Sequence, residues 1–413
     1  MGNLLSRVGP GMMVAAVGVG VSHLVQSTRA GADFGLSLVL LVIIVVVLKY
    51  PAFRFGVAYA SATGRSLITA YARIGKTALI WMGLASIVDM FIAPTAVALV
   101  TAGLVVSIFG LPYSAPMVAV GLLIVSALVL LNGHYMRAER IIKVLVIVFS
   151  ILTVLAVIFA LPLLGSDGRS MFADLQYDRS LLLFVIAITG WMPMPLSGAV
   201  FQSKWICERR RAVGAENFTF QQALTDLRIG YGLTLVLAVC FVVMGTAVLF
   251  ETDRVAPQNP GAFAAELLSI FTTVFGKWMY PVISLAALAV MWSTLIALMD
   301  GSPRVVDRIS TYLGKDSDAT KDRYTLFLAV QIVGSIVIIL FLMGSFVGFL
   351  DFATSMGFAA APAIAYFNYR AVTSDEITGE FRPNTVLTVW SWISIISLTG
   401  FALSYFLFRF ILV

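Results

Sequence analysis

Charged residues are scarce in this sequence. Only 12% of its 413 residues are Asp, Glu, Lys or Arg, whereas soluble domains carry about 25%. This shortage excludes an ordinary soluble domain, and the 60% hydrophobic content indicates a chain whose main solvent is lipid. The net charge of +6 comes from basic residues in short loops between apolar runs, so it favours membrane orientation over nucleic-acid binding.

Cysteine and histidine are almost missing. Cys207 and Cys240, with His23 and His134, match no metal-ligand spacing, and no disulfide framework is expected. The sequence has no HExxH motif, nucleophile elbow or phosphate-binding loop, so we predict that it is not an enzyme and uses no cofactor. No cleavable signal precedes the first apolar run, which we expect to stay in the protein.

Long apolar runs are abundant instead, and each can cross about 30 Å of hydrocarbon as a helix. The sequence therefore predicts an all-α membrane protein with one transmembrane domain over residues 1–413. Short interfacial helices are expected at 65–75 and 261–273, and polar loops at 204–225 and 301–321. Eleven spans are predicted, at about 7–28, 35–60, 77–109, 115–133, 141–164, 180–203, 226–249, 278–300, 322–345, 347–370 and 384–412.

The distribution of basic residues predicts the orientation. With the N-terminus in the cytoplasm, 21 of the 27 Lys and Arg residues are assigned to the inside, including Lys49, Arg54 and Arg65. The C-terminus then lies outside. We expect an integral protein of the plasma (inner) membrane of a bacterium.

Two spans carry helix-breaking residues near their centres. The first contains Gly18-Val19-Gly20-Val21-Ser22-His23, and the sixth contains Gly190-Trp191-Met192-Pro193-Met194-Pro195 before Ser197 and Gly198. Glycine and proline weaken a helix and free backbone groups, which are tolerated at membrane depth only around a cavity or buried site. Breaks in corresponding spans predict a transporter with two inverted five-helix repeats, about 7–164 and 180–370, and an extra helix at 384–412.

At these residues the sequence resembles the Nramp family, natural resistance-associated macrophage proteins that carry divalent metals with protons. Gly9-Pro10-Gly11 opens the first span as in that family, and Ala30-Gly31-Ala32-Asp33-Phe34-Gly35 is similar to its A-G-A-x-F-G. Pro94–Leu99 resembles G-T-A-I-A-L, and Gln202-Ser203-Lys204 resembles Q-S-R. The resemblance implies the amino-acid–polyamine–cation transporter fold, with helices 1 and 6 unwound around the substrate.

The chain departs from the family at the site itself. The family's D-P-G-N falls on Gly20, Val21, Ser22 and His23, so the metal-binding Asp is lacking and the chain resembles a divergent member. The M-P-H of span six falls on Met192-Pro193-Met194. The acid of span three falls on Phe91, with Asp89 out of register.

The predicted substrate site therefore comprises Gly20, Ser22, His23, Met192, Met194 and Ser197, with freed carbonyls but no carboxylate. Any metal would be bound by His23, Met192 and Met194, which suit a softer ion. A small organic acid or another polar solute is the alternative substrate on the same fold, and a non-transporting receptor or sensor is the alternative class. The expected partners are the lipid bilayer and a small substrate with coupling protons or another ion, and no nucleic acid.

Ionisable residues in or beside the spans predict coupling and gating. Asp89 and His23 are the candidates for the proton pathway, because intramembrane ionisable groups are costly and usually functional. Gate residues are predicted at Asp300 with Arg304, and at Asp351 with Thr354. Near the outer surface Asp33 is expected to pair with Arg29, and His134 is expected to be a satisfied polar group.

Overall fold

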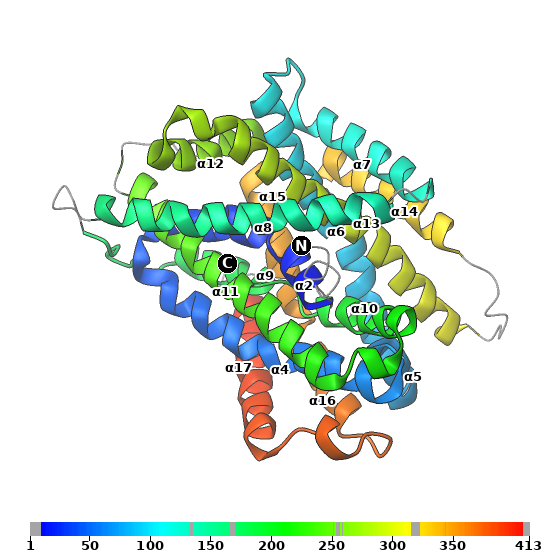
Figure 1. The fold of residues 1–413 in the computed structure, drawn as a ribbon. Coiled ribbons are helices and arrows are strands. Elements are labelled where there is room, and N and C mark those ends of the chain that lie inside the picture. Colours follow the sequence, from blue (N-terminus) through cyan, green and yellow to red (C-terminus); the bar gives the residue numbers. More distant parts are fainter. Residues whose placement is uncertain are drawn as a thin grey trace.

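The computed structural model describes residues 10–132, 135–164, 170–250, 259–314, 323–342 and 344–407, together with the single residues 252 and 257. Within these residues the fold is helical, and the one β-bridge joins Gly35 to Phe172. His134 lies outside the described residues, so its predicted role stays a prediction. Figure 1 shows the helices gathered in one bundle around the two broken spans.

The helices follow the predicted spans closely. The α-helices are α2 (Pro10–Gly18), α3 (Thr28–Phe34), α4 (Val39–Thr63), α5 (Leu67–Ile74), α6 (Lys76–Phe109), α7 (Ala115–Leu131), α8 (Tyr135–Ala160), α9 (Arg179–Trp191), α10 (Gly198–Val213), α11 (Phe220–Leu249), α12 (Pro260–Phe275), α13 (Tyr280–Leu313), α14 (Tyr324–Val337), α15 (Phe346–Ala359), α16 (Ala361–Val372) and α17 (Thr385–Phe406). Two π-helical segments join them, η1 (Ser22–Ser27) and η6 (Ile338–Leu342). Short 3-10 turns are η2 (Leu36–Leu38), η3 (Leu161–Leu163), η4 (Ala215–Asn217), η5 (Lys277–Met279) and η7 (Gly379–Phe381).

Two expected loops are partly helical. The polar stretch after residue 203 continues α10 to Val213, and the stretch after residue 300 continues α13 to Leu313. Lys, Glu and Arg residues with good helix propensity extend α10 beyond the apolar part of its span. α13 continues past residue 300 because Val305, Val306 and Ile309 on it are buried in the bundle. The prediction of loops over 204–213, 220–225 and 301–313 is therefore wrong, since α11 also begins before residue 226.

The position of Lys49 also corrects the sequence analysis. It was counted with the cytoplasmic loops, but it lies within α4 and its side chain is fully buried. The rest of the charge asymmetry does not depend on it. The orientation remains a prediction.

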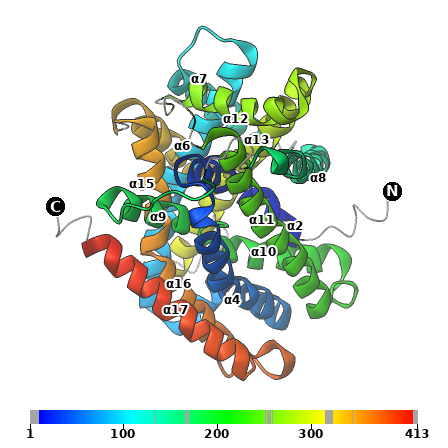
Figure 2. The ribbon, with the colours of Figure 1, turned by 90° about the vertical axis from the view of Figure 1, so that its left-hand side faces the viewer.

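The broken first span lies at the centre of the bundle. α13 packs along α6, while α11 packs along α2, η1 and α3. α3 and α11 are in backbone contact, because a Cβ on Gly31 would lie 2.0 Å from the carbonyl oxygen of Val242 and one on Gly245 would lie 2.3 Å from that of Thr28. Small residues allow such approach between membrane helices. α17 lies at the edge beside α4 and α16 in both views (Figures 1 and 2).

The outer surface fits a lipid solvent. Eight of the described helical segments are long and apolar enough to cross a membrane, and α7, α9 and α12 are shorter apolar helices. Large apolar side chains are exposed along α7, α14 and α17, including Leu128, Val333 and Ile396. The protein is therefore an integral membrane protein. The count of eleven spans and the inverted repeats stay predictions.

Candidate substrate site

The two helix breaks predicted from the sequence lie against each other. α2 ends at Gly18 and η1 begins at Ser22, while α9 ends at Trp191 and α10 begins at Gly198. The Ser22 hydroxyl lies 3.1 Å from the carbonyl oxygen of Gly18 and 3.2 Å from that of Pro193. One side chain thus bridges the break of the first span and the break of the sixth.

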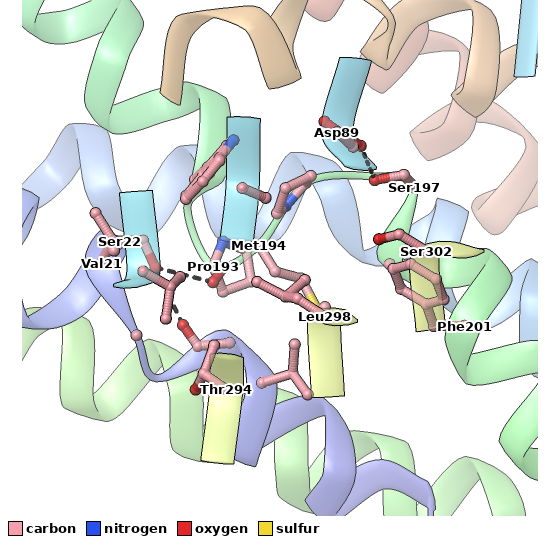
Figure 3. Close-up of a pocket in the computed structure, with 18 residues that line it drawn as sticks. Val21, Ser22, Asp89, Pro193, Met194, Ser197, Phe201, Thr294, Leu298 and Ser302 are labelled. Carbon is pink, nitrogen blue, oxygen red and sulfur yellow. Dashed lines mark hydrogen bonds between the residues drawn. The ribbon is translucent and has the colours of Figure 1, made fainter. Parts of the chain in front are cut away.

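A small cavity lies at this junction (Figure 3). Its volume is about 40 Å³, which is room for roughly three water molecules or one partly hydrated ion. The first span, α6, the α9–α10 break and α13 form its wall. The rest of the lining is glycine, proline and apolar residues, and the polar side chains on the wall are Ser22, Asp89, Ser197, Thr294 and Ser302.

Asp89 brings a carboxylate to the cavity. It projects from α6, and its Oδ2 accepts a 2.6 Å hydrogen bond from the Ser197 hydroxyl, as Figure 3 shows. The expectation that the centre holds no carboxylate is therefore wrong, because the register of the resemblance pointed to Phe91 whereas the packing of α6 presents Asp89. Among the described residues that line the cavity, Asp89 is the only charged one.

Ser197 is held in an unusual way for its position. It is the N-cap residue of α10, where a serine hydroxyl ordinarily accepts a hydrogen bond from the first turn. Here the side chain makes no capping hydrogen bond and instead donates to Asp89. Ser197 thus orients the carboxylate and leaves the first turn of α10 without a side-chain cap. Such departures from local helix preferences are typical of functional sites.

His23 faces away from the cavity. Its side chain is fully buried, with Nε2 3.0 Å from the carbonyl oxygen of Thr234 on α11 and Nδ1 2.9 Å from the Ser22 hydroxyl. Neighbouring side chains of this span point in different directions, so Ser22 reaches the cavity and His23 turns toward α11. The expectation that His23 faces the Met192–Ser197 break is not met.

Of the two methionines, only one lies on the cavity wall. Met194 lines the cavity and packs on Gly198, whereas Met192 is fully buried outside the lining. Among the described residues there is no group of three or more His, Cys, Asp or Glu that could hold a metal. His23, Met192 and Met194 therefore do not form one ligand set around this cavity.

The predicted inner gate residues are in contact. Arg304 pairs with Asp300 one turn earlier on α13, at 2.8 Å, and Tyr324 of α14 donates a 3.0 Å hydrogen bond to the same carboxylate. The Arg304 guanidinium also lies 4.1 Å from the centre of the Tyr324 ring. This cluster ties α13 to α14.

The predicted outer gate residues join the first span to α15. Arg29 pairs with Asp351 at 2.6 Å, and the Gln26 amide donates to Asp351 at 3.0 Å and to Thr354 at 3.2 Å. Arg29 was expected to pair with Asp33, but the structure pairs it with Asp351. On the same side a Cβ on Gly190 would lie 1.9 Å from the Thr354 carbonyl oxygen, so α9 and α15 are in direct backbone contact.

A larger hollow of about 710 Å³ lies between α5, α10 and α13. It begins one turn from the cavity, because Phe201 and Ser302 line the cavity while Lys204 and Arg304 line the hollow. The Phe201 ring would lie 3.0 Å from a Cβ on Gly301, so it fills the space between α10 and α13 at this level. Phe201 thus lies at the border of the cavity on the side of the hollow.

Several site residues were not found from the sequence. Thr294 and Ser302 belong to α13, and the buried Ser302 hydroxyl has no hydrogen-bond partner within the described residues. Thr294, Leu298 and Ser302 follow one another at intervals of four, which is the spacing of a single helix face. This spacing in the sequence could have indicated that the three residues face the same site.

Comparison with known proteins identifies the family. A family model described as natural resistance-associated macrophage protein-like matches residues 11–408. The chain belongs to the Nramp family. An uncharacterized protein of Pasteurella multocida is 29% identical over 404 residues, which is 96% of this chain and 91% of the relative.

Solved structures show the same fold. A mutant of the manganese transporter of Eremococcus coleocola matches with a TM-score of 0.73 at 16% identity, covering 97% of this Nramp chain and 86% of the other. MhsT in complex with L-phenylalanine matches with a TM-score of 0.63 at 14% identity, covering 95% and 98%. Because Nramp proteins are transporters, this chain is a membrane transport protein and not an enzyme, as predicted.

Proposed function

We propose that this Nramp protein is a secondary active transporter of a divalent metal ion, which it binds between the breaks of spans one and six. The observation that carries the proposal is the Asp89 carboxylate on the cavity wall. It accepts a hydrogen bond from Ser197, which belongs to the break of span six. A bare cation in a low-dielectric interior needs opposite charge nearby. Asp89 supplies from α6 the charge that the family's first span would supply at Gly20.

Apart from the thioether sulfur of Met194, the remaining donors are oxygen atoms. The hydroxyls of Ser22, Ser197 and Thr294 and the carbonyl of Pro193 line or border the same small space. Hard divalent ions take several oxygen ligands, including carboxylates and carbonyls, and complete their shell with water. The volume of the cavity suits one such ion with part of its hydration. Support also comes from the likeness to solved manganese transporters.

Proton coupling would act through the same carboxylate. A protonated Asp89 has no charge to offer a cation, so the metal and a proton compete for it. Metal affinity should therefore fall as the pH is lowered. The Arg29–Asp351 contact would close the outer side, while Phe201 and the Asp300–Arg304 pair would control the route to the hollow beside α10.

A small organic cation is the second candidate. The wall is mostly apolar apart from one carboxylate, and such a site also suits a small amine or zwitterion. An organic acid would meet the charge of Asp89 unless that group were protonated. The cavity chemistry therefore favours a cationic substrate of either kind.

Calorimetry on the purified protein tests the proposal. We expect manganese to bind the wild type, Asp89→Glu to retain weaker binding, and Asp89→Asn to lose at least a hundredfold in affinity. Asp375→Asn makes the same chemical change at an exposed residue after α16, outside the cavity and the gates, and should bind within a few-fold of the wild type. Methylammonium bound in an Asp89-dependent way, with no response to manganese, would establish the second candidate instead.

A further inference from the structure

A buried lysine lies behind the break of span six. Lys49 of α4 is fully buried, and its Nζ donates hydrogen bonds of 2.7 Å to the carbonyl oxygen of Thr189 and 2.7 Å to that of Gly190. A lysine within a membrane span is costly, and such residues are usually functional. Neither the cavity nor the predicted gates account for it.

The two carbonyls belong to the buried C-terminal end of a half-helix. α9 ends at Trp191, so the carbonyl groups of its last residues lack partners within the helix. The aligned peptide dipoles also give this end partial negative charge, which favours a cation. Within the described part of the chain, these carbonyls are the recorded partners of Lys49, and no carboxylate pairs with it.

The half-helix end leads directly into the cavity wall. Trp191 follows Gly190 and lines the cavity together with Pro193 and Met194. On its other face, Gly190 contacts the backbone of Thr354. The ammonium group therefore contacts the last turn of α9, directly before the break of the sixth span.

We propose that the end of α9 is a monovalent-cation site, which the chain fills with its own Lys49 ammonium. The bound ammonium holds the freed carbonyls and so positions the cavity wall formed by the break. Lys49 is a positioning residue and does not line the substrate cavity. The site itself stands apart from the proposed transport function, and only its effect on transport rests on that function. Because the cation is attached to the chain, substrate binding needs no free monovalent cation at this place.

Chemical rescue tests the site without any substrate. Lys49→Ala removes three methylene groups and the ammonium, which n-propylammonium matches in length and charge. Hydrogen–deuterium exchange of the segment 186–196 is measured with n-propylammonium, with n-propanol as the neutral control, and in Lys49→Met, which fills the space without a donor. We expect exchange at least fivefold faster in both variants, restored in Lys49→Ala by n-propylammonium alone.

Two outcomes would overturn the proposal. Wild-type exchange in Lys49→Met would show that the charge is dispensable, and equal rescue by n-propanol would show that only volume matters. Should Lys49→Ala not purify, Lys49→Met decides alone: faster exchange supports the need for the ammonium, and wild-type exchange overturns the proposal.

The consequence in transport is measured separately, as manganese accumulation by proteoliposomes. Lys49→Ala should lose accumulation and regain it with n-propylammonium. A wild-type protein that does not carry manganese would refute the proposed function while the exchange experiment still judges Lys49.

Discussion

Removing the Ser197 hydroxyl tests how the carboxylate is held. Ser197→Ala deletes the donor of the 2.6 Å hydrogen bond to Asp89. It removes no capping interaction from α10, because the native side chain makes none. The loss therefore falls on the site, as the orientation of the carboxylate and as the hydroxyl oxygen that Ser197 offers the ion. Groups that orient a metal ligand typically contribute about 10–100-fold in metal affinity, and we expect a loss of this size, about 1.4–2.8 kcal/mol.

The assay is calorimetric titration of manganese into purified wild-type and variant protein. Ser293→Ala is the matched control, because Ser293 is buried on α13 and its hydroxyl donates to the Val290 carbonyl of the same helix. It should bind manganese like the wild type. Unchanged affinity in Ser197→Ala, or an equal loss in Ser293→Ala, would refute the assignment of the carboxylate to the substrate site.

Four further outcomes follow from the structure. Gly20→Asp adds a second carboxylate at the cavity and should tighten manganese binding at least tenfold in titrations, whereas weaker binding would favour an uncharged or anionic substrate. His23→Ala breaks two buried hydrogen bonds and should lower stability by about 1–3 kcal/mol in thermal unfolding, with affinity within a few-fold of the wild type. Gly190→Ala places a methyl group on the α15 backbone and should cost about 1–3 kcal/mol in the same assay; an unchanged melting temperature would contradict the close contact. A cysteine at the 93%-exposed Tyr177 should react with maleimide from outside, and one at Ala212 only after permeabilisation, the reverse pattern overturning the orientation.

The breaks could be predicted from the sequence because their cause is local. Glycine and proline at Gly18–Gly20 and Pro193–Pro195 act on their own helix wherever it lies. The ends of α10 and α13 could not be predicted in this way, since a run of charged residues does not by itself end a helix. Charge marks the limit of the apolar segment and not the limit of the helix.

The chemistry of the site depends on tertiary packing, which the sequence shows only indirectly. Asp89 could be recognised as an intramembrane acid, but not as a cavity residue, because the facing of α6 is set by its packing against α13 and α12. His23 lies next to Ser22 in the chain, yet one helical step turns it toward α11. The partners of Lys49 are 140 residues away in sequence, and nothing near it predicts them.

Anomalous diffraction from crystals grown with manganese tests the central claim most directly. The account predicts one manganese peak at the junction of the two breaks, within coordination distance of the Asp89 carboxylate, and its loss in Asp89→Asn. A peak bound elsewhere in the wild type, or one that persists at the junction in Asp89→Asn, would contradict it.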